Sequence, residues 1–209
     1  GTSTTTGADN TAIGDRTFKT ATTGNTNVAV GGTSMENTTT GSDNTTVGKQ
    51  AGVAVTTGTN NTFIGSAAGD SVTIGNNDVA VGQIALATVT TTNHNVAIGR
   101  ASQQLATGSA NVSMGSDSLE DVTGDYNVAI GYLSGSETSS ATRSTWIGGQ
   151  SGRNANSSYS VAVGYDSLGG SATGAGNVAI GDSVLRNNTS GNSNTAVGSF
   201  NGSTLPALY

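Results

Sequence analysis

The segment Asn95-Val96-Ala97-Ile98-Gly99 is one of twelve copies of a five-residue phrase that runs along the 209-residue chain. Each copy reads Asn, Asp or Ser, then Thr or Val, then most often Ala, then Ile, Val or Met, and then a closing glycine. Successive closing glycines are 16 or 17 residues apart. This period is too short for helix-pair repeats or propeller blades, and it suits one coil of a solenoid. We therefore expect an all-β parallel solenoid of about twelve coils, a single domain over 1–209 with repeats over about 7–202.

The composition fits such a repeat and excludes several other classes of protein. Glycine supplies 32 residues, charged residues only 10%, and there is one proline and no cysteine. Collagen, Pro-rich disorder, disulfide frameworks and thiolate metal sites are therefore excluded. A net charge of −6 with seven Lys and Arg offers no basic stripe for nucleic acid. No apolar run is long enough for a membrane-spanning helix, and we expect the chain to be a segment of a longer fibre.

The alternation along each phrase predicts which side chains lie inside the coil. The residue before the closing glycine and the residue two places earlier share one face of a strand, because strand side chains alternate. Both positions are occupied by β-branched or apolar residues, so we expect this face to be the interior. The position four residues after the closing glycine is predicted to form the opposite wall. It holds large residues in some coils and glycine in others: Phe18, Met35, Gly52, Gly69, Leu86, Gln103, Leu119, Gly135, Gly152, Leu168, Leu185 and Gly202.

The middle position of the phrase then points outward and forms an alanine column. A continuous alanine stripe on an outer face suggests close approach of neighbouring subunits, and hence self-association. Phe63 and Trp146 interrupt the stripe and are expected to form hydrophobic plugs between subunits. The predicted interface consists of Ala12, Ala29, Phe63, Ala80, Ala97, Ala129, Trp146, Ala162, Ala179 and Ala196.

Two other columns have predicted structural roles. The residue that opens each phrase is Asn in nine copies, which predicts a hydrogen-bonded asparagine ladder from coil to coil. Glycine recurs seven residues before the closing glycine, and a repeated corner there needs either positive φ or close backbone approach. The residue after the closing glycine varies between coils and includes Tyr132 and Tyr165, so this column is expected to face solvent.

These phrases resemble the head repeats of YadA-like trimeric autotransporter adhesins and the related repeats of phage tail fibres and bacterial fibre proteins. The resemblance covers about 7–202. It implies a left-handed β-roll, an intertwined or side-by-side homotrimer, an extracellular location on a cell-surface appendage or virion, and a role in attachment. The period of 16 to 17 residues is closer to the phage-type repeats than to the adhesin heads.

Few residues offer chemistry, and no catalytic, cofactor or metal site is expected. His94, the single histidine, lies in an irregular segment and is interpreted as a surface residue. The acids Asp117, Glu120, Asp121 and Asp125 could supply Ca²⁺ ligands, but their spacing does not repeat in adjacent coils, so a solvated acidic patch is favoured. The least repetitive stretch, 136–160, contains the candidate receptor contacts: Arg143, Trp146, Arg153 and Tyr159.

The sequence thus favours a non-enzymatic, trimeric extracellular fibre segment that attaches to a cell-surface glycan or protein receptor. Two alternatives stay open. The threonines that precede the corner glycines would suit an ice-binding solenoid, and a polysaccharide-degrading β-helix would need an acidic pair in a groove. Membrane insertion by this segment is not expected.

Overall fold

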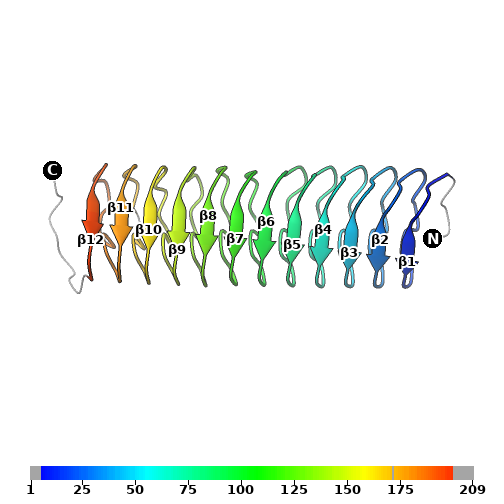
Figure 1. The fold of residues 1–209 in the computed structure, drawn as a ribbon, viewed down its shortest axis with the longest axis horizontal. Coiled ribbons are helices and arrows are strands. Elements are labelled where there is room, and N and C mark those ends of the chain that lie inside the picture. The colour runs from blue at the N-terminus through cyan, green and yellow to red at the C-terminus, as the bar shows by residue number, and fades with distance from the viewer. Residues whose placement is uncertain (1–5, 171, 200–209) are drawn as a thin grey trace. The chain divides into compact units, whose positions relative to one another are not determined.

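The computed structural model describes residues 6–170 and 172–199, and all regular structure within these ranges is β-strand. The described chain has twelve short strands, and Figure 1 shows that a loop connects each strand to the start of the next one along the chain. The chain divides into two compact units, Gly1–Thr107 and Gly108–Tyr209. The first unit contains β1 (Thr11–Ile13), β2 (Val28–Val30), β3 (Thr45–Val47), β4 (Thr62–Ile64), β5 (Val79–Val81) and β6 (Val96–Ile98). The second contains β7 (Val112–Met114), β8 (Val128–Ile130), β9 (Thr145–Ile147), β10 (Val161–Val163), β11 (Val178–Ile180) and β12 (Thr195–Val197).

Within each unit, successive strands pair in parallel and in register. Ala80 of β5 lies opposite Ala97 of β6, and Ala162 of β10 lies opposite Ala179 of β11. Equivalent residues of the phrase therefore stack in columns, as the repeat predicts. The parallel β-solenoid is confirmed.

The strand face that lies inside the coil is the opposite of the predicted one. In β5, Ala80 is fully buried, whereas Val79 and Val81 on either side of it are only half-buried. In β9, Trp146 is fully buried and Ile147 is exposed. The two columns expected inside therefore lie on the outer surface, and the alanine column lines the interior. The reason is steric, because the coil is too narrow to hold two columns of β-branched side chains and a large residue from the opposite wall.

The predicted subunit interface is consequently wrong for most of its members. Ala29, Phe63, Ala80, Ala97, Ala129, Trp146, Ala162 and Ala179 are fully buried inside the coils of one chain. Ala12 and Ala196 lie in the first and last described strands, where Ala12 is exposed and Ala196 half-buried. Phe63 and Trp146 are core residues and not plugs between subunits.

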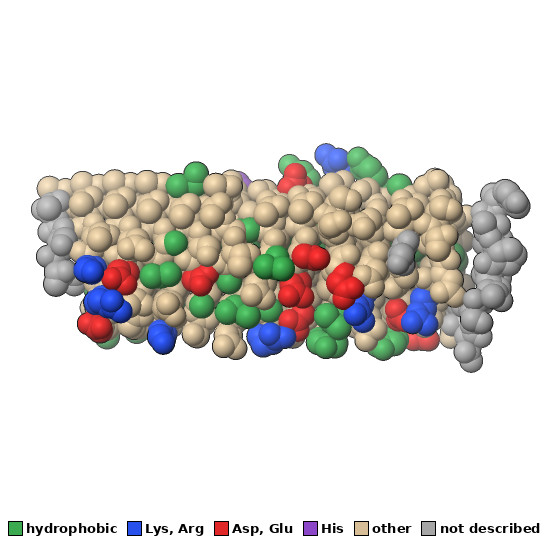
Figure 2. Space-filling model, turned by 180° about the vertical axis from the view of Figure 1, so that it is seen from behind, with side chains coloured by type: hydrophobic (Ala, Val, Ile, Leu, Met, Phe, Trp, Pro, Cys, Tyr) green, Lys and Arg blue, Asp and Glu red, His purple; other side chains and the backbone are tan. Residues whose placement is uncertain are grey.

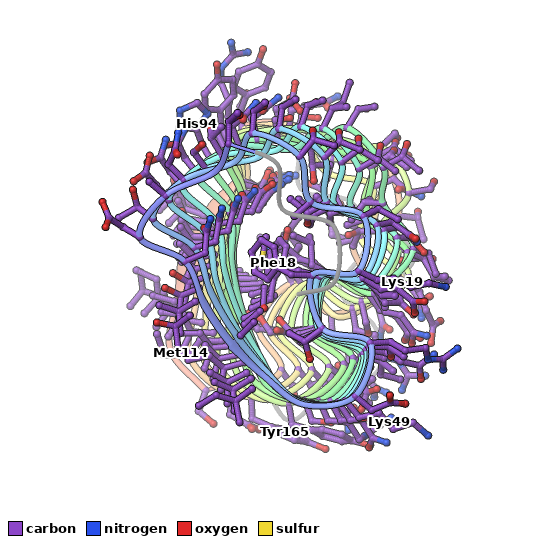
Figure 3. All side chains as sticks on the ribbon, turned by 90° about the vertical axis from the view of Figure 1, so that its right-hand side faces the viewer. Phe18, Lys19, Lys49, His94, Met114 and Tyr165 are labelled. Carbon is purple, nitrogen blue, oxygen red and sulfur yellow. The ribbon has the colours of Figure 1, made fainter. Side chains whose placement is uncertain are left out.

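The opposite wall lies where the sequence predicts it. Its large members Phe18, Met35, Leu86, Leu119 and Leu168 are fully buried. Figure 3 shows Phe18 pointing into the coil, while Lys19 points outward. In these coils the core is therefore a small strand residue packed against one large residue from the opposite wall.

Two coils reverse this arrangement of sizes. Phe63 in β4 is large, and the opposite-wall positions before and after this strand are Gly52 and Gly69. A Cβ atom on Gly52 would lie 3.1 Å from Cδ2 of Phe63. Trp146 in β9 is flanked in the same way by Gly135 and Gly152, and a Cβ atom on either glycine would collide with the indole ring. Each large strand residue thus fills the space that two glycines leave.

Of the two possible reasons for a corner glycine, positive φ and close backbone approach, the structure supports the second. Gly58, seven residues before its closing glycine, has no left-handed φ, but a Cβ atom there would lie 2.5 Å from the carbonyl oxygen of Gly75 in the next coil. Close backbone approach therefore requires glycine at this column. The left-handed corners lie elsewhere, as in the fourth coil at Asn60 (φ 59°), Ala67 (φ 55°) and Gly69 (φ 60°).

The asparagine ladder is confirmed. The Asn44 side-chain Nδ2 donates to the carbonyl oxygen of Gly58 at 2.8 Å, and Asn44 Oδ1 accepts from the backbone N–H of Asn61 at 3.0 Å. Asn27 makes the equivalent bonds to Gly41 and to Asn44. Because these side chains are buried, the ladder satisfies backbone groups that would otherwise lack partners.

Candidate functional site

The most continuous exposed apolar feature is the outer face of the strands, which we call the strand face. It consists of the first and third residues of each strand. In the first unit its exposed members include Ile13, Val47 and Ile64, and in the second Met114, Ile130, Ile147, Ile180 and Val197. Figure 3 shows Met114 pointing away from the interior of its coil. This row of partly exposed apolar side chains is the candidate surface for an interaction.

The predicted receptor contacts do not form one cluster. Trp146 is fully buried and cannot meet a receptor, so this prediction is wrong. Arg153 forms an ion pair with Glu137, with Nη2 and Oε1 2.9 Å apart. The structure does bring Arg143 and Tyr159 together, and it adds Tyr126, which the sequence reasoning missed.

The spacing of the sequence places Tyr126 in the same column as Arg143 and Tyr159. Tyr126, Arg143 and Tyr159 each lie five residues before a closing glycine, so they occupy one column in three successive coils. We call this group the Tyr-Arg-Tyr cluster. Its members stand at a corner of the coil where φ is positive. Figure 2 shows hydrophobic, basic and acidic side chains projecting together from the upper edge of the molecule.

The guanidinium of Arg143 lies between two aromatic rings. Its Cζ is 5.5 Å from the ring centroid of Tyr126 and 5.7 Å from that of Tyr159. Arg143 Nη1 also donates to the hydroxyl of Tyr159 at 3.1 Å. The two distances from the guanidinium to the ring centroids fall within the range of cation–π attraction. This attraction holds the three side chains together.

Asp78 is an unusual member of the asparagine ladder. Its backbone N–H donates to Asn61 Oδ1 at 2.9 Å, and its Oδ1 accepts from the N–H of Asn95 at 2.8 Å. Its Oδ2 is buried and has no hydrogen-bond partner among the described residues. Burial raises the pKa of Asp78 to about 7, although the bonds to Asn95 oppose this shift. The carboxyl therefore occupies a position that suits a neutral amide.

The remaining polar candidates are dispersed. The His94 side chain has no hydrogen-bond or ion-pair partner among the described residues. The backbone N–H of His94 donates to the backbone carbonyl oxygen of Asn76 at 3.1 Å as part of the corner. Asp125 Oδ1 accepts from the backbone N–H of Ser109 at 2.7 Å, a contact between coils. In the described part of the chain no three acidic or histidine side chains gather as metal ligands.

The threonine column that suggested ice binding is interrupted. Thr23, Thr40 and Thr57 are exposed in successive coils, but Ile74 takes the next place and is exposed as well. The threonines one place earlier instead donate to the next coil, as Thr39 Oγ1 does to Thr56 O at 3.1 Å. This surface therefore lacks an uninterrupted hydroxyl array.

Comparison of the chain with protein-family models, with curated proteins and with solved structures found no match. Over residues 6–170 and 172–199, no helix has the length and apolar character needed to cross a bilayer.

Proposed function

We propose that this chain is a segment of a non-enzymatic extracellular fibre, formed by three copies and serving attachment to a cell surface. The observation that carries the proposal is the strand face, an outward row of Val, Ile, Met and Thr that recurs in every described coil. Such a face is unfavourable in water, and copies of the same chain would cover it most simply because their faces repeat at the same spacing. The assembly of three chains is inferred from the resemblance to YadA-like and tail-fibre repeats.

The coil architecture suits a mechanical role. Coils about 4.8 Å apart, each bonded to the next through backbone and asparagine side chains, form a stiff spacer. Three copies would present each corner column three times, so weak contacts to a cell surface would combine through effective concentration. The location on a surface appendage or virion belongs to the same proposal.

Native mass spectrometry and sedimentation of the purified chain test the assembly. The expected species has three times the 20.4 kDa mass of the chain at micromolar concentration. Ile130→Glu combined with Ile147→Glu should dissociate it, because each substitution places a charge on the strand face. Thr57→Glu, exposed in the threonine column, is the matched control and should leave the mass unchanged. A monodisperse parent monomer would contradict the proposal.

A further inference from the structure

The residues of the Tyr-Arg-Tyr cluster differ in type from those that occupy the same column in the first unit. In the first unit the described positions of this column are Asp9, Thr26, Asp43, Asn60, Asn77 and His94, all with φ between 57° and 62°. Asn and Asp tolerate this left-handed conformation better than bulky residues do. Tyr126, Arg143 and Tyr159 adopt it with φ of 62°, 54° and 58°. The column therefore keeps one backbone conformation, while three consecutive coils carry large side chains where the first unit has mostly short polar ones.

The cluster is held rigidly by the backbone beneath it. The N–H of Arg143 donates to Asp125 O at 3.0 Å, and that of Tyr159 donates to Thr142 O at 2.9 Å. Tyr126 N–H bonds in the same way to Ser109 O at 3.2 Å. The three side chains therefore project from fixed backbone positions one coil apart.

Each tyrosine retains an open ring face. One face of Tyr126 and of Tyr159 is turned toward Arg143, while the next residue of the column on the other side is Ala110 and Gly176, respectively. Neither neighbour has a side chain large enough to cover a phenol ring. Both tyrosines are 59% exposed. An exposed aromatic face of this kind suits the apolar C–H face of a sugar ring.

Arg143 adds a positive charge that the protein does not neutralise. Among the described residues no carboxylate forms an ion pair with it, whereas Arg153 and Arg186 are paired with Glu137 and Asp166. One of its N–H groups is bonded to the Tyr159 hydroxyl. The others can donate together to a carboxylate, the geometry that guanidinium recognises best.

We propose that the Tyr-Arg-Tyr cluster binds an acidic oligosaccharide, with a sugar carboxylate on Arg143 and sugar rings on Tyr126 and Tyr159. This inference deepens the proposed attachment function and rests on it, since it names the chemistry of the receptor. Sialic acids and uronic acids share the required carboxylated ring.

Calorimetry or ligand-observed NMR on the purified full chain tests the site, with sialyllactose and a galacturonate trimer as acidic probes and lactose as the neutral probe. At least one acidic probe should bind ten times more tightly than lactose, and more weakly as salt is raised. Arg143→Asn should weaken that binding at least tenfold, and Tyr126→Asn with Tyr159→Asn should do the same. Asparagine is chosen because the same column holds it in folded coils at Asn60 and Asn77.

Two controls make the outcome specific. Tyr165→Ser removes an exposed tyrosine from another column and should leave binding unchanged, while Arg143→Lys keeps the charge without the planar fork and should weaken binding. Equal binding of lactose and both acidic probes, or parent-like binding by the Asn variants, would overturn the proposal. A trimer that binds cells after sialidase and uronate lyase treatment, but not after Arg143→Asn, would show a protein receptor and overturn the saccharide assignment. A monomer that still binds the acidic probe would refute the trimeric fibre and leave the site standing.

Discussion

A Cβ atom on Gly69 would lie 2.6 Å from Cδ2 of Phe63, which is closer than the two carbons can approach. The glycine and the phenylalanine therefore occupy one volume of the core between them. The same relationship joins Gly152 to Trp146 in the second unit. In several coils that hold alanine at the strand position, a large residue of the other wall is buried instead, as Leu86 is in the coil of Ala80.

This shared volume predicts strong coupling between Phe63 and Gly69. Phe63→Ala alone should cost about 3–5 kcal/mol of unfolding free energy because it leaves a cavity. Gly69→Leu alone should also destabilise through overpacking, although Leu86 shows that leucine accepts the left-handed φ of this column. The double variant should be more stable than the sum of the two effects predicts, by at least about 1 kcal/mol. Denaturant unfolding of all four proteins measures this coupling, and purely additive losses would contradict it.

Neighbouring residues of β8 should respond in opposite ways to the same substitution. Ala129→Glu places a carboxylate in the buried interior and should prevent stable folding, because no partner is available there. Ile130→Glu lies on the strand face and should preserve the fold while weakening self-association. Circular dichroism and sedimentation distinguish the two effects. An Ala129→Glu protein that folds normally would show that the interior is assigned to the wrong face.

Asp78 should make stability depend on pH. The carboxyl titrates near pH 7 in the folded chain and near 4 when unfolded. Folding favours the protonated form of this carboxyl. Its contribution to the stability of the folded chain is therefore complete below the unfolded pKa, and it is lost as the pH rises from about 4 to about 7. Asp78→Asn should therefore raise the unfolding free energy at pH 8 by up to about 4 kcal/mol and change it little at pH 4.

Denaturant unfolding at pH 4, 6 and 8 checks this difference between Asp78→Asn and the parent. The reverse change, Asn61→Asp, should introduce a second loss of stability over the same range, since Asn61 Nδ2 donates to Gly75 O at 2.7 Å. A constant difference between Asp78→Asn and the parent at all three values would refute the assignment.

The asparagine ladder should be costly to interrupt. Asn44→Ala removes the donor to Gly58 O and the acceptor for Asn61 N–H, both of them buried. We expect a loss of about 2–4 kcal/mol, because each buried group left without a partner costs about 1–3 kcal/mol. Asn37→Ala, at an exposed position without a left-handed φ, is the matched control and should cost less than about 1 kcal/mol. Thermal unfolding compares the two, and equal losses would remove the special role of the ladder.

The repeat by itself determined the period, the columns and the parallel register, because residues 16 or 17 apart can stack only if each phrase closes one coil. It also predicted the ladder of Asn27, Asn44 and Asn61, since identical amides one coil apart can bond to one another. The opposite wall followed from its pattern of large residues and glycines.

Only the tertiary structure decided which strand face is inside. Alternation places Val79 and Val81 on one side of the strand and Ala80 on the other. It does not say which of the two sides is buried. Hydrophobicity favoured the valines, but the buried strand position holds mostly small residues, and the large Phe63 and Trp146 occur there beside glycines of the opposite wall. The volume of the interior, which depends on how the loop returns to the next strand, therefore outweighed the apolar character of the individual side chains.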